Sequence, residues 1–449
     1  MHRRDLLKSS AGAAAWLAMG RQLPIYAAYA REFSLRAAPI TVPIGATPWP
    51  TWAYNGRLPG PEIRVTRGDR VRIVLDNALQ AETTIHWHGL PVPPAMDGVP
   101  GLSQAPVPPG GRFVYEFDAA VSGTFFYHSH VGLQLDRGLY GAFIVEEPGE
   151  NDRLHVDREH VLVLDDWMAG NPEDALANTG GMMGGGPLYN GYLLNGTLGP
   201  TPFTVRTGER VRLRIINAAA ATVFRFGIDG HTLTVTHTDG QPVQSASVST
   251  LAIGMGERYD IMVTTNRPGN WPILVSADGS VVPRMLGVLA YEGADRPASP
   301  PFIWPAELQQ GPALRYANLR SATAAAFDAR AVTTIPVVLG GGMGGMFGAT
   351  AWTINGQRYP AADPFFVREG TVVALAMTNR SMMPHPMHLH GHMGWLRVAD
   401  GWIAKDTVLV NPMESLTLAF TADNPGRWLF HCHNAYHMEL GMARAVEYR

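Results

Sequence analysis

The sequence predicts an all-β protein built from three copies of one Greek-key sandwich or barrel. Turn-forming residues are abundant, with 49 Gly and 35 Pro among 449 residues, and 46% of the residues are hydrophobic. Short alternating runs bounded by Gly, Pro and Asn recur along the chain, as strands and their turns do. One longer pattern occurs three times, which is typical of a duplicated domain.

The N-terminal segment, residues 1–30, is typical of an export signal. Arg3 and Arg4 precede an apolar run too short to span a bilayer, and residues 28–30 (AYA) offer a small-residue cleavage site. This arrangement resembles a twin-arginine signal. We therefore expect passage through the twin-arginine export machinery into the periplasm, no stable membrane insertion, and a mature chain that starts near Arg31.

The formal net charge of the chain is −3. The excess of positive charge that is typical of nucleic-acid-binding proteins is therefore absent from the composition.

Each of the three copies contains an Asn-Gly turn, alternating residues, a Gly and a strand that ends in Asn. The copies are YNGRLPGPEIRVTRGDRVRIVLDN (54–77), LNGTLGPTPFTVRTGERVRLRIIN (194–217) and INGQRYPAADPFFVREGTVVALAMTN (354–379). Asn-Gly is a strong hairpin signal. We expect domains at 31–151, 152–295 and 331–449, with a linker rich in Pro and Ala at 296–330.

Four His-x-His pairs stand at matching positions in the first and third copies. They are His86 and His88, His128 and His130, His388 and His390, and His431 and His433. The second copy has Phe226, Ile228, Leu274 and Ser276 at corresponding positions. Side chains alternate across a strand, so each pair offers two imidazoles to one face. One such pair would be ordinary, but four matched pairs predict a cluster that holds more than one metal ion.

The only cysteine of the chain, Cys432, lies between the two histidines of the last pair. On a strand its side chain points away from theirs, into its own domain. His437 and Met442 follow it at offsets of five and ten, and His385 stands three residues before His388. The first copy has Ser129 in place of the cysteine. One thiolate, two imidazoles and a distant thioether form the ligand set of a blue-copper electron-transfer centre. The chain would then join the two sites by a covalent path of roughly 10 Å.

The motifs HWHG from His86, HSH from His128, HPMHLHG from His385 and HCHNAYHMELGM from His431 resemble the multicopper oxidases. The resemblance covers nearly the whole mature chain, in the three-domain form that includes laccases, cuprous oxidases and copper-resistance oxidases. It implies cupredoxin domains, four coppers per chain, and one-electron oxidation of a donor coupled to reduction of dioxygen to two waters.

The resemblance also implies which residues hold each copper. The type 2 copper would be held by His86 and His388, one type 3 copper by His88, His128 and His433, the other by His130, His390 and His431, and the type 1 copper by His385, Cys432, His437 and Met442.

Cys432 is the candidate for electron entry. Two acidic residues are candidates for proton supply. Asp97, in MDGVP, resembles the acidic residue that family members keep beside the cluster, although Asp-Gly is also an ordinary turn signal. Many bacterial members place a glutamate directly after the last type 1 histidine. Here Met438 stands at that position and Glu439 follows it, so Glu439 is the second candidate.

Methionines near Gly-rich segments bear on the electron donor. They are Met182, Met183, Met343 and Met346, with Met382 and Met383 just before His385. Thioethers are soft ligands suited to cuprous ion, but methionine also fills irregular gaps. Ser381 stands where cuprous oxidases often have an aspartate. The sequence favours cuprous ion as donor and a role in copper tolerance. The alternatives are a laccase-like oxidase of phenols and aromatic amines, and a copper-binding or sequestration protein without turnover.

Overall fold

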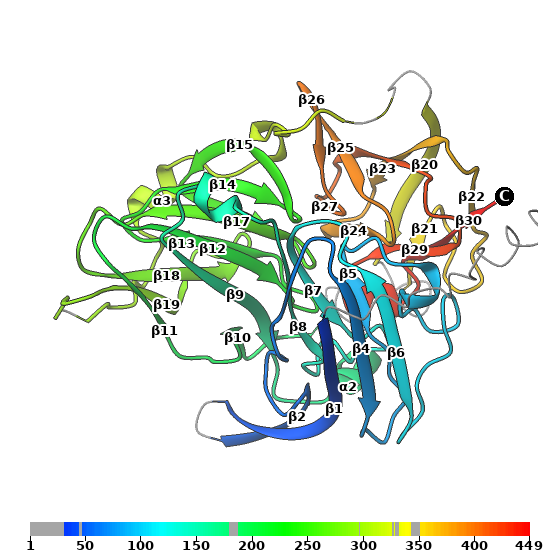
Figure 1. Ribbon diagram of the computed structural model, residues 1–449, viewed down its shortest axis with the longest axis horizontal. Coiled ribbons are helices and arrows are strands. Elements are labelled where there is room, and N and C mark those ends of the chain that lie inside the picture. Colours follow the sequence, from blue (N-terminus) through cyan, green and yellow to red (C-terminus); the bar gives the residue numbers. More distant parts are fainter. Residues whose placement is uncertain are drawn as a thin grey trace, which may run out of the picture.

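The computed structural model describes residues 31–44, 47–178, 187–295, 297–325, 327, 332–342 and 351–449. Within these residues the strands form six sheets, which follow one another along the chain as three pairs (Figure 1). The prediction of an all-β fold is confirmed. None of the described helices is long and apolar enough to cross a membrane.

The first pair consists of two four-stranded sheets, ordered β2-β1-β4-β6 and β3-β8-β7-β5. Their strands are β1 (Arg31–Ile44), β2 (Thr47–Tyr54), β3 (Ile63–Thr66), β4 (Arg70–Asn77), β5 (His86–His88), β6 (Arg112–Asp118), β7 (Gly123–His128) and β8 (Tyr140–Glu146). The chain changes sheet after β2 and after each of the next four strands, which is a Greek-key path. Leu75 of one sheet and Phe143 of the other belong to one apolar core, so the pair is a sandwich.

The second pair repeats this plan with a six-stranded sheet, β10-β9-β12-β17-β14-β15, and a five-stranded sheet, β11-β19-β18-β13-β16. Its strands are β9 (Arg158–Trp167), β10 (Gly191–Leu194), β11 (Thr201–Val205), β12 (Arg210–Asn217), β13 (Phe224–Ile228), β14 (Leu233–Thr238), β15 (Gln241–Val248), β16 (Thr250–Ile253), β17 (Arg258–Thr264), β18 (Asn270–Ala277) and β19 (Arg284–Tyr291). We call this pair the middle sandwich.

The third pair has the same sizes, with sheets ordered β21-β20-β23-β28-β25-β26 and β22-β30-β29-β24-β27. Its strands are β20 (Val332–Gly341), β21 (Trp352–Ile354), β22 (Phe365–Val367), β23 (Val372–Asn379), β24 (His385–Leu389), β25 (Gly394–Val398), β26 (Gly401–Ala404), β27 (Thr407–Val410), β28 (Ser415–Thr421), β29 (Arg427–Cys432) and β30 (Ala443–Tyr448). In all three pairs the second strand of the repeated segment, β4, β12 or β23, lies parallel to the first strand of its pair.

The asparagine that ends each repeat is buried and ties the following loop to a neighbouring backbone. Its side-chain amide donates two hydrogen bonds: Asn77 to Ala81 O (2.8 Å) and Val107 O (2.9 Å), Asn217 to Thr222 O (3.0 Å) and Ile253 O (2.8 Å), and Asn379 to Met383 O (2.7 Å) and Val410 O (3.0 Å). Buried amides need such partners, which explains why Asn recurs there. In the outer sandwiches this connection precedes the strands that carry His86 and His385.

The described helices are short and lie in the connections. They are η1 (Pro94–Met96), α1 (Glu150–Arg153), α2 (Pro172–Asn178), α3 (Ala306–Gln310), η3 (Tyr316–Asn318) and α4 (Ala435–Glu439). In the expected linker, Trp304 and Leu308 are buried, and Leu314 N donates to Thr250 O of the middle sandwich (2.9 Å). This part of the linker therefore packs against the middle sandwich.

Candidate metal centres

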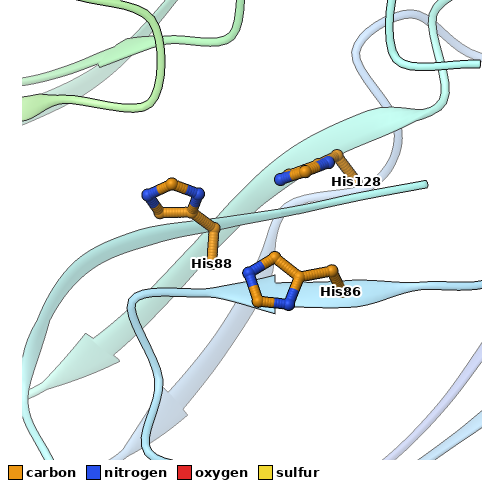
Figure 2. A group of neighbouring side chains, drawn as sticks. All are labelled: His86, His88 and His128. Atoms are coloured by element: carbon orange, nitrogen blue, oxygen red, sulfur yellow. The ribbon is translucent and has the colours of Figure 1, made fainter. Parts of the chain in front are cut away.

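The His-x-His pairs lie on adjacent strands, or at the ends of those strands, in each outer sandwich. In the first, His86 of β5 lies opposite His128 of β7. In the third, His388 of β24 lies opposite His431 of β29. Figure 2 shows how close the imidazoles of His86, His88 and His128 lie. Strand pairing thus brings two pairs together within each sandwich.

Contacts between the outer sandwiches bring all four pairs to one place. The ring of His86 stacks on that of His390, and the ring of His88 stacks on that of His388, both with centroids 3.8 Å apart. His130 approaches His431 to 5.0 Å between ring centroids. None of the eight histidines is more than 5% exposed. The eight imidazoles form one buried group, called the histidine cluster below.

The nitrogen atoms of the histidine cluster fit a set of metal ions. Among the described residues, several of these buried nitrogens have no hydrogen-bond partner: Nε2 of His86, His128, His130 and His388, Nδ1 of His88, and both nitrogens of His433. The Nε2 atoms of His390 and His431 lie 3.0 Å apart. Since buried polar atoms normally have partners, this many orphaned nitrogens at one place fit the ligand atoms of a metal centre. Imidazole nitrogens suit copper and other transition metals.

The outer ring nitrogens are held by backbone carbonyls, which fixes the tautomers. Nδ1 donates to a carbonyl oxygen at 2.9 Å in four cases: His86 to Asp97 O, His128 to Ser129 O, His388 to Asp406 O and His431 to Cys432 O. A ring that donates through Nδ1 presents the lone pair of Nε2 to the cluster.

The electrostatics of the cluster favour neutral imidazoles. Burial lowers the pKa of six histidines well below the usual value, and neighbouring imidazoles lower it further: His88, His128, His130, His388, His390 and His433. Burial lowers the pKa of His431 to about 3. Because a metal binds the neutral ring, the cluster is ready for metal ions at neutral pH.

Asp97 lies against this cluster and is fully buried. Its carboxylate oxygens accept from His390 Nδ1 at 3.0 and 3.2 Å, and one of them lies 3.2 Å from His86 Nδ1. Burial raises the pKa of this carboxyl group, and the hydrogen bond from His86 opposes the shift. Gly98 follows with φ of +81°, and a Cβ there would lie 1.9 Å from Ile85 O. The Asp-Gly pair thus makes a tight turn and also places a carboxylate on two histidines.

The structure does not bring Glu439 to the histidine cluster. This residue is exposed at the end of α4, and among the described residues no hydrogen bond or ion pair joins it to a cluster histidine. Met438 instead lines a cavity of about 20 Å³, together with His128, His130 and His431. That volume is about the space one water molecule needs.

The second predicted group lies in the third sandwich. Cys432 Sγ is 3.6 Å from Nδ1 of His385 and 3.6 Å from Nδ1 of His437, and these two nitrogens are 3.1 Å apart. His437 is positioned by the cap of α4, where the Asn434 side chain accepts its backbone N–H. Met442 is fully buried, and its backbone pairs with those of Cys432 and His437.

The donor set of this second group fits a soft metal ion. Burial raises the pKa of the Cys432 thiol, so a bound cation is what would hold it as a thiolate. Burial lowers the pKa of His385 to about 3, which keeps that ring neutral. A thiolate and two imidazoles suit copper, and the thioether of Met442 is the predicted fourth donor.

Two residues that the sequence did not single out as functional contact this group. Ser381 Oγ lies 2.7 Å from Nε2 of His385, the nitrogen that faces away from Cys432. Trp352 covers the histidines, with its ring 4.1 Å from that of His437 and 5.0 Å from that of His385. A Cβ at Gly342 would lie 2.6 Å from the indole, so a glycine there makes room for it.

The methionines expected near a donor site are only partly described. Met182, Met183, Met343 and Met346 lie outside the described residues. Met382 is 77% exposed, and Met383 is half-buried against the apolar core.

The same protein family matches three successive parts of the chain. Three family models, each described as multicopper oxidase, match residues 38–150, 158–294 and 337–449. Each sandwich is therefore covered by its own family model.

Individual relatives match over almost the full length. The chain is 38% identical to multicopper oxidase MmcO of Mycobacterium tuberculosis, over 92% of this chain and 86% of the relative. It is 29% identical to copper resistance protein A of Escherichia coli, over 92% of both chains. The crystal structure of a laccase from Botrytis aclada matches with a TM-score of 0.80 and 27% identity, covering 93% of this chain and 87% of the laccase. With its two groups of copper-type donors, the chain belongs to the multicopper oxidase family and is a three-domain, copper-dependent oxidoreductase.

Proposed function

We propose that this multicopper oxidase oxidises cuprous ion and so protects the cell from copper. Four cuprous ions give up one electron each, and one dioxygen molecule takes up these electrons and four protons to become two waters. When bound, copper at the Cys432 group supplies the one-electron acceptor, and copper at the histidine cluster supplies the place where dioxygen is reduced. Asp97 contacts the rings of His390 and His86 and is the carboxylate that we assign to proton supply.

We assign four copper ions to the chain, in the arrangement that the motifs imply. The ligands are His86 and His388 for the type 2 copper, His88, His128 and His433 for one type 3 copper, His130, His390 and His431 for the other, and His385, Cys432, His437 and Met442 for the type 1 copper. The orphaned nitrogens and the 3.6 Å distances from Cys432 Sγ support this assignment.

One observation carries the proposal of turnover. Cys432 faces the second group, and its two sequence neighbours, His431 and His433, belong to the histidine cluster. An electron that enters through the cysteine therefore has a covalent route of roughly 10 Å to either histidine. A sequestration protein has no need for such a route, since it transfers no electrons.

The surroundings of His437 favour cuprous ion over a phenol as the donor. His385 and His437 are fully buried, and the Trp352 indole packs on both. In the part of the chain that the structure describes, neither imidazole therefore has an exposed edge that a phenol ring could contact directly. Met382 presents a thioether at the surface three residues before His385. The name of the relative copper resistance protein A agrees with a role in copper tolerance.

We also propose that residues 1–30 direct export through the twin-arginine machinery, which would place the mature enzyme in the periplasm. These residues lie outside the described part of the chain, so sequence alone supports this step. We further propose that the sandwiches correspond to domains 31–151, 152–295 and 331–449, with the linker 296–330 joining the last two.

Dioxygen uptake by the copper-loaded enzyme tests the proposed donor. We expect kcat/KM to be much higher for cuprous ion than for a substituted phenol. Both donors are kept anaerobic until the reaction is started under the same conditions. A preference for the phenol would identify a laccase-like enzyme. Uptake with neither donor would indicate copper binding without turnover.

Replacing Trp352 by alanine tests whether the indole excludes aromatic donors. We expect Trp352→Ala to raise kcat/KM for a phenol by about tenfold or more, because small changes in pocket shape discriminate substrates by such factors. Oxidation of cuprous ion should change much less. Trp352→Phe, which keeps a ring over His437, is the matched control, and an equal gain in both variants would refute the exclusion.

Ser381→Ala removes the hydroxyl that orients His385. The buried Nε2 would lose its partner at 2.7 Å, and an unsatisfied buried group costs about 1–3 kcal/mol. We expect lower copper affinity at the Cys432 group and an altered absorption spectrum of that centre. Ser381→Thr keeps the hydroxyl and should retain the wild-type spectrum. An unchanged spectrum in Ser381→Ala would show that the hydroxyl does not orient the ring.

A further inference from the structure

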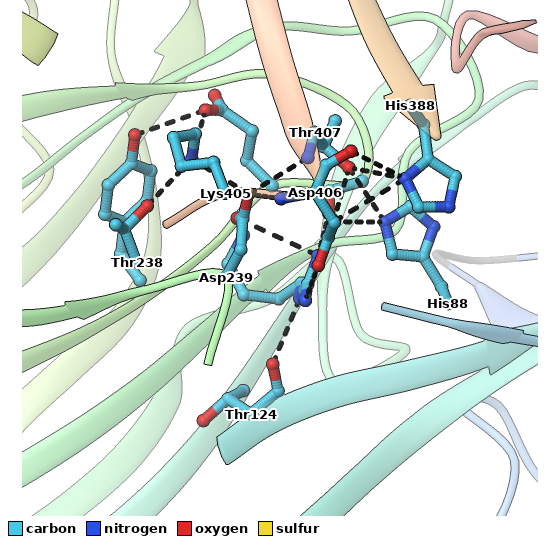
Figure 3. Close-up of polar contacts among 12 residues, drawn as sticks. His88, Thr124, Thr238, Asp239, His388, Lys405, Asp406 and Thr407 are labelled. Atoms are coloured by element: carbon cyan, nitrogen blue, oxygen red, sulfur yellow. Dashed lines mark hydrogen bonds and ion pairs between the residues drawn. The ribbon is translucent and has the colours of Figure 1, made fainter. Parts of the chain in front are cut away.

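Five charged side chains are buried where the middle sandwich meets the histidine cluster. Asp239, Glu257 and Arg258 come from the middle sandwich, and Lys405 and Asp406 come from the third. None is more than 1% exposed. Figure 3 shows the contacts that join this group to His88 and His388. Burial of charge costs desolvation free energy, and a buried ion pair often adds little net stability. A role of this group other than stabilisation of the fold is therefore worth testing.

Arg258 is the centre of the group and contacts all three sandwiches. Its guanidinium donates to both carboxylate oxygens of Asp406, at 2.7 and 2.6 Å. Its Nε donates to Thr124 O of β7, the strand that ends at His128, at 3.0 Å. A planar guanidinium with two bonds to one carboxylate fixes both direction and distance.

Asp406 and Thr407 contact two histidines that belong to different sandwiches. His88 Nε2 lies 3.2 Å from Asp406 Oδ1 and 2.9 Å from Thr407 Oγ1. His388 Nδ1 donates to Asp406 O at 2.9 Å. These contacts leave Nδ1 of His88 and Nε2 of His388 without partners among the described residues. A carboxylate that accepts from the outer nitrogen of a metal-binding histidine sets its tautomer and ring orientation.

The remaining charges clamp the segment 405–407 to the middle sandwich. Asp239 accepts from the backbone N–H groups of Asp406 (3.2 Å) and Thr407 (3.1 Å). Lys405 Nζ lies 3.0 Å from Asp239 and 2.9 Å from Glu257. The clamp therefore holds the backbone of Asp406 as well as its side chain.

Asp406 acts through the histidines and is not itself a metal ligand in this arrangement. One of its oxygens lies within 4.8 Å of donor nitrogens of His88 and His388, which would suit a ligand. Both of its oxygens, however, accept hydrogen bonds from Arg258. A carboxylate held in this way orients a neighbour better than it reaches a metal.

We propose that Arg258 is a positioning residue of the histidine cluster: the middle sandwich, which supplies no predicted copper ligand, sets the orientation of His88 and His388 through the Arg258–Asp406 pair. The inference rests on the proposed assignment of these two histidines as copper ligands. It gives the middle sandwich a direct part in the metal centre, beyond joining the outer sandwiches.

The test compares Arg258→Met with Arg212→Met in purified full-length enzyme. Arg212 is also fully buried in the middle sandwich and pairs with Asp260 at 2.6 Å, but in the described structure it has no contact with the cluster histidines. Arg258→Lys keeps the charge without the two-point contact, and it remains informative if Arg258→Met does not fold. Three quantities are measured: copper per chain during titration with a chelator, the absorption of the Cys432 copper centre, and the melting temperature.

We expect Arg258→Met to lower copper affinity at the histidine cluster by about 10–100-fold, with a smaller loss in Arg258→Lys. The absorption of the Cys432 centre should persist in both. Arg212→Met should lower the melting temperature while cluster affinity stays at the wild-type value. Wild-type affinity in both Arg258 variants, or a loss in Arg212→Met as large as that in Arg258→Met, would overturn the proposal.

His88→Ala separates failure of this inference from failure of the ligand assignment. If His88→Ala loses cluster copper and the Arg258 variants do not, the assignment stands and the positioning role is wrong. If His88→Ala keeps all of its copper, the ligand assignment itself is wrong, and the positioning role falls with it. Neither result depends on the identity of the electron donor, because both are read from metal content.

Discussion

Cys432→Ser is expected to abolish oxidation of the donor while leaving the coppers of the histidine cluster largely bound. The hydroxyl of serine is a poor ligand for a soft metal, so the site made with His385 and His437 would lose its copper. The eight cluster histidines are unchanged, and their outer nitrogens keep their partners. We expect turnover to fall by about a hundredfold or more, equivalent to about 2.7 kcal/mol of activation free energy.

Metal analysis and dioxygen uptake together check this result. The expected variant has lost one copper per chain and the absorption of the cysteine centre. Ser129→Ala, at the equivalent position between His128 and His130, should reduce turnover far less, since among the described residues no second group of metal-type donors includes Ser129 or lies on its face as the His385–Cys432–His437 group does for Cys432. Loss of the cluster coppers along with the cysteine centre would contradict the proposed division between the two sites.

Asp97→Asn is expected to have the second largest effect. The carboxylate contacts Nδ1 of His390 at 3.0 Å and Nδ1 of His86 at 3.2 Å. The amide keeps the shape but removes a negative charge beside the proposed coppers and one acceptor position. We expect a loss of about 10–100-fold in cluster copper affinity or in turnover, the usual range for partners of metal-binding histidines.

The rate of dioxygen uptake with cuprous ion measures turnover. Titration with a chelator measures the copper affinity of the histidine cluster. Asp118→Asn, an exposed change in the same sandwich, is the control and should behave like the wild type. Wild-type turnover and affinity in Asp97→Asn would show that Asp97 serves only the tight turn before Gly98.

The sequence predicted the parts of the site that repeat. Equal offsets from Asn77 and Asn379 located the pairs that begin at His86 and His388, and these two asparagines make corresponding hydrogen bonds in the outer sandwiches. The pairs that begin at His128 and His431 were located by the similar segments GTFFYHSH and GRWLFHCH. Strand alternation placed Cys432 on the face opposite its neighbouring histidines. These are local features, and local features are what a sequence pattern records.

The supporting residues could not be predicted, because their contacts join distant parts of the chain. Arg258 and Asp406 are 148 residues apart, and Arg258 lies in the copy that lacks the histidine pairs. In the sequence Ser381 is only a departure from aspartate, yet its hydroxyl contacts the outer nitrogen of His385. Glu439 shows the reverse: its position in the motif makes it a candidate, but it is exposed at the end of α4, and among the described residues no hydrogen bond or ion pair joins it to a cluster histidine.

The stoichiometry of dioxygen consumption tests the central claim most directly. Known amounts of cuprous ion would be added to copper-loaded enzyme in a closed cell, with hydrogen peroxide assayed in parallel and Cys432→Ser as the blank for spontaneous oxidation. We expect one dioxygen consumed for every four cuprous ions, no peroxide, and a rate far above the blank. Two cuprous ions per dioxygen with accumulation of peroxide, or a rate equal to the blank, would contradict oxidation at the Cys432 group coupled to water formation at the histidine cluster.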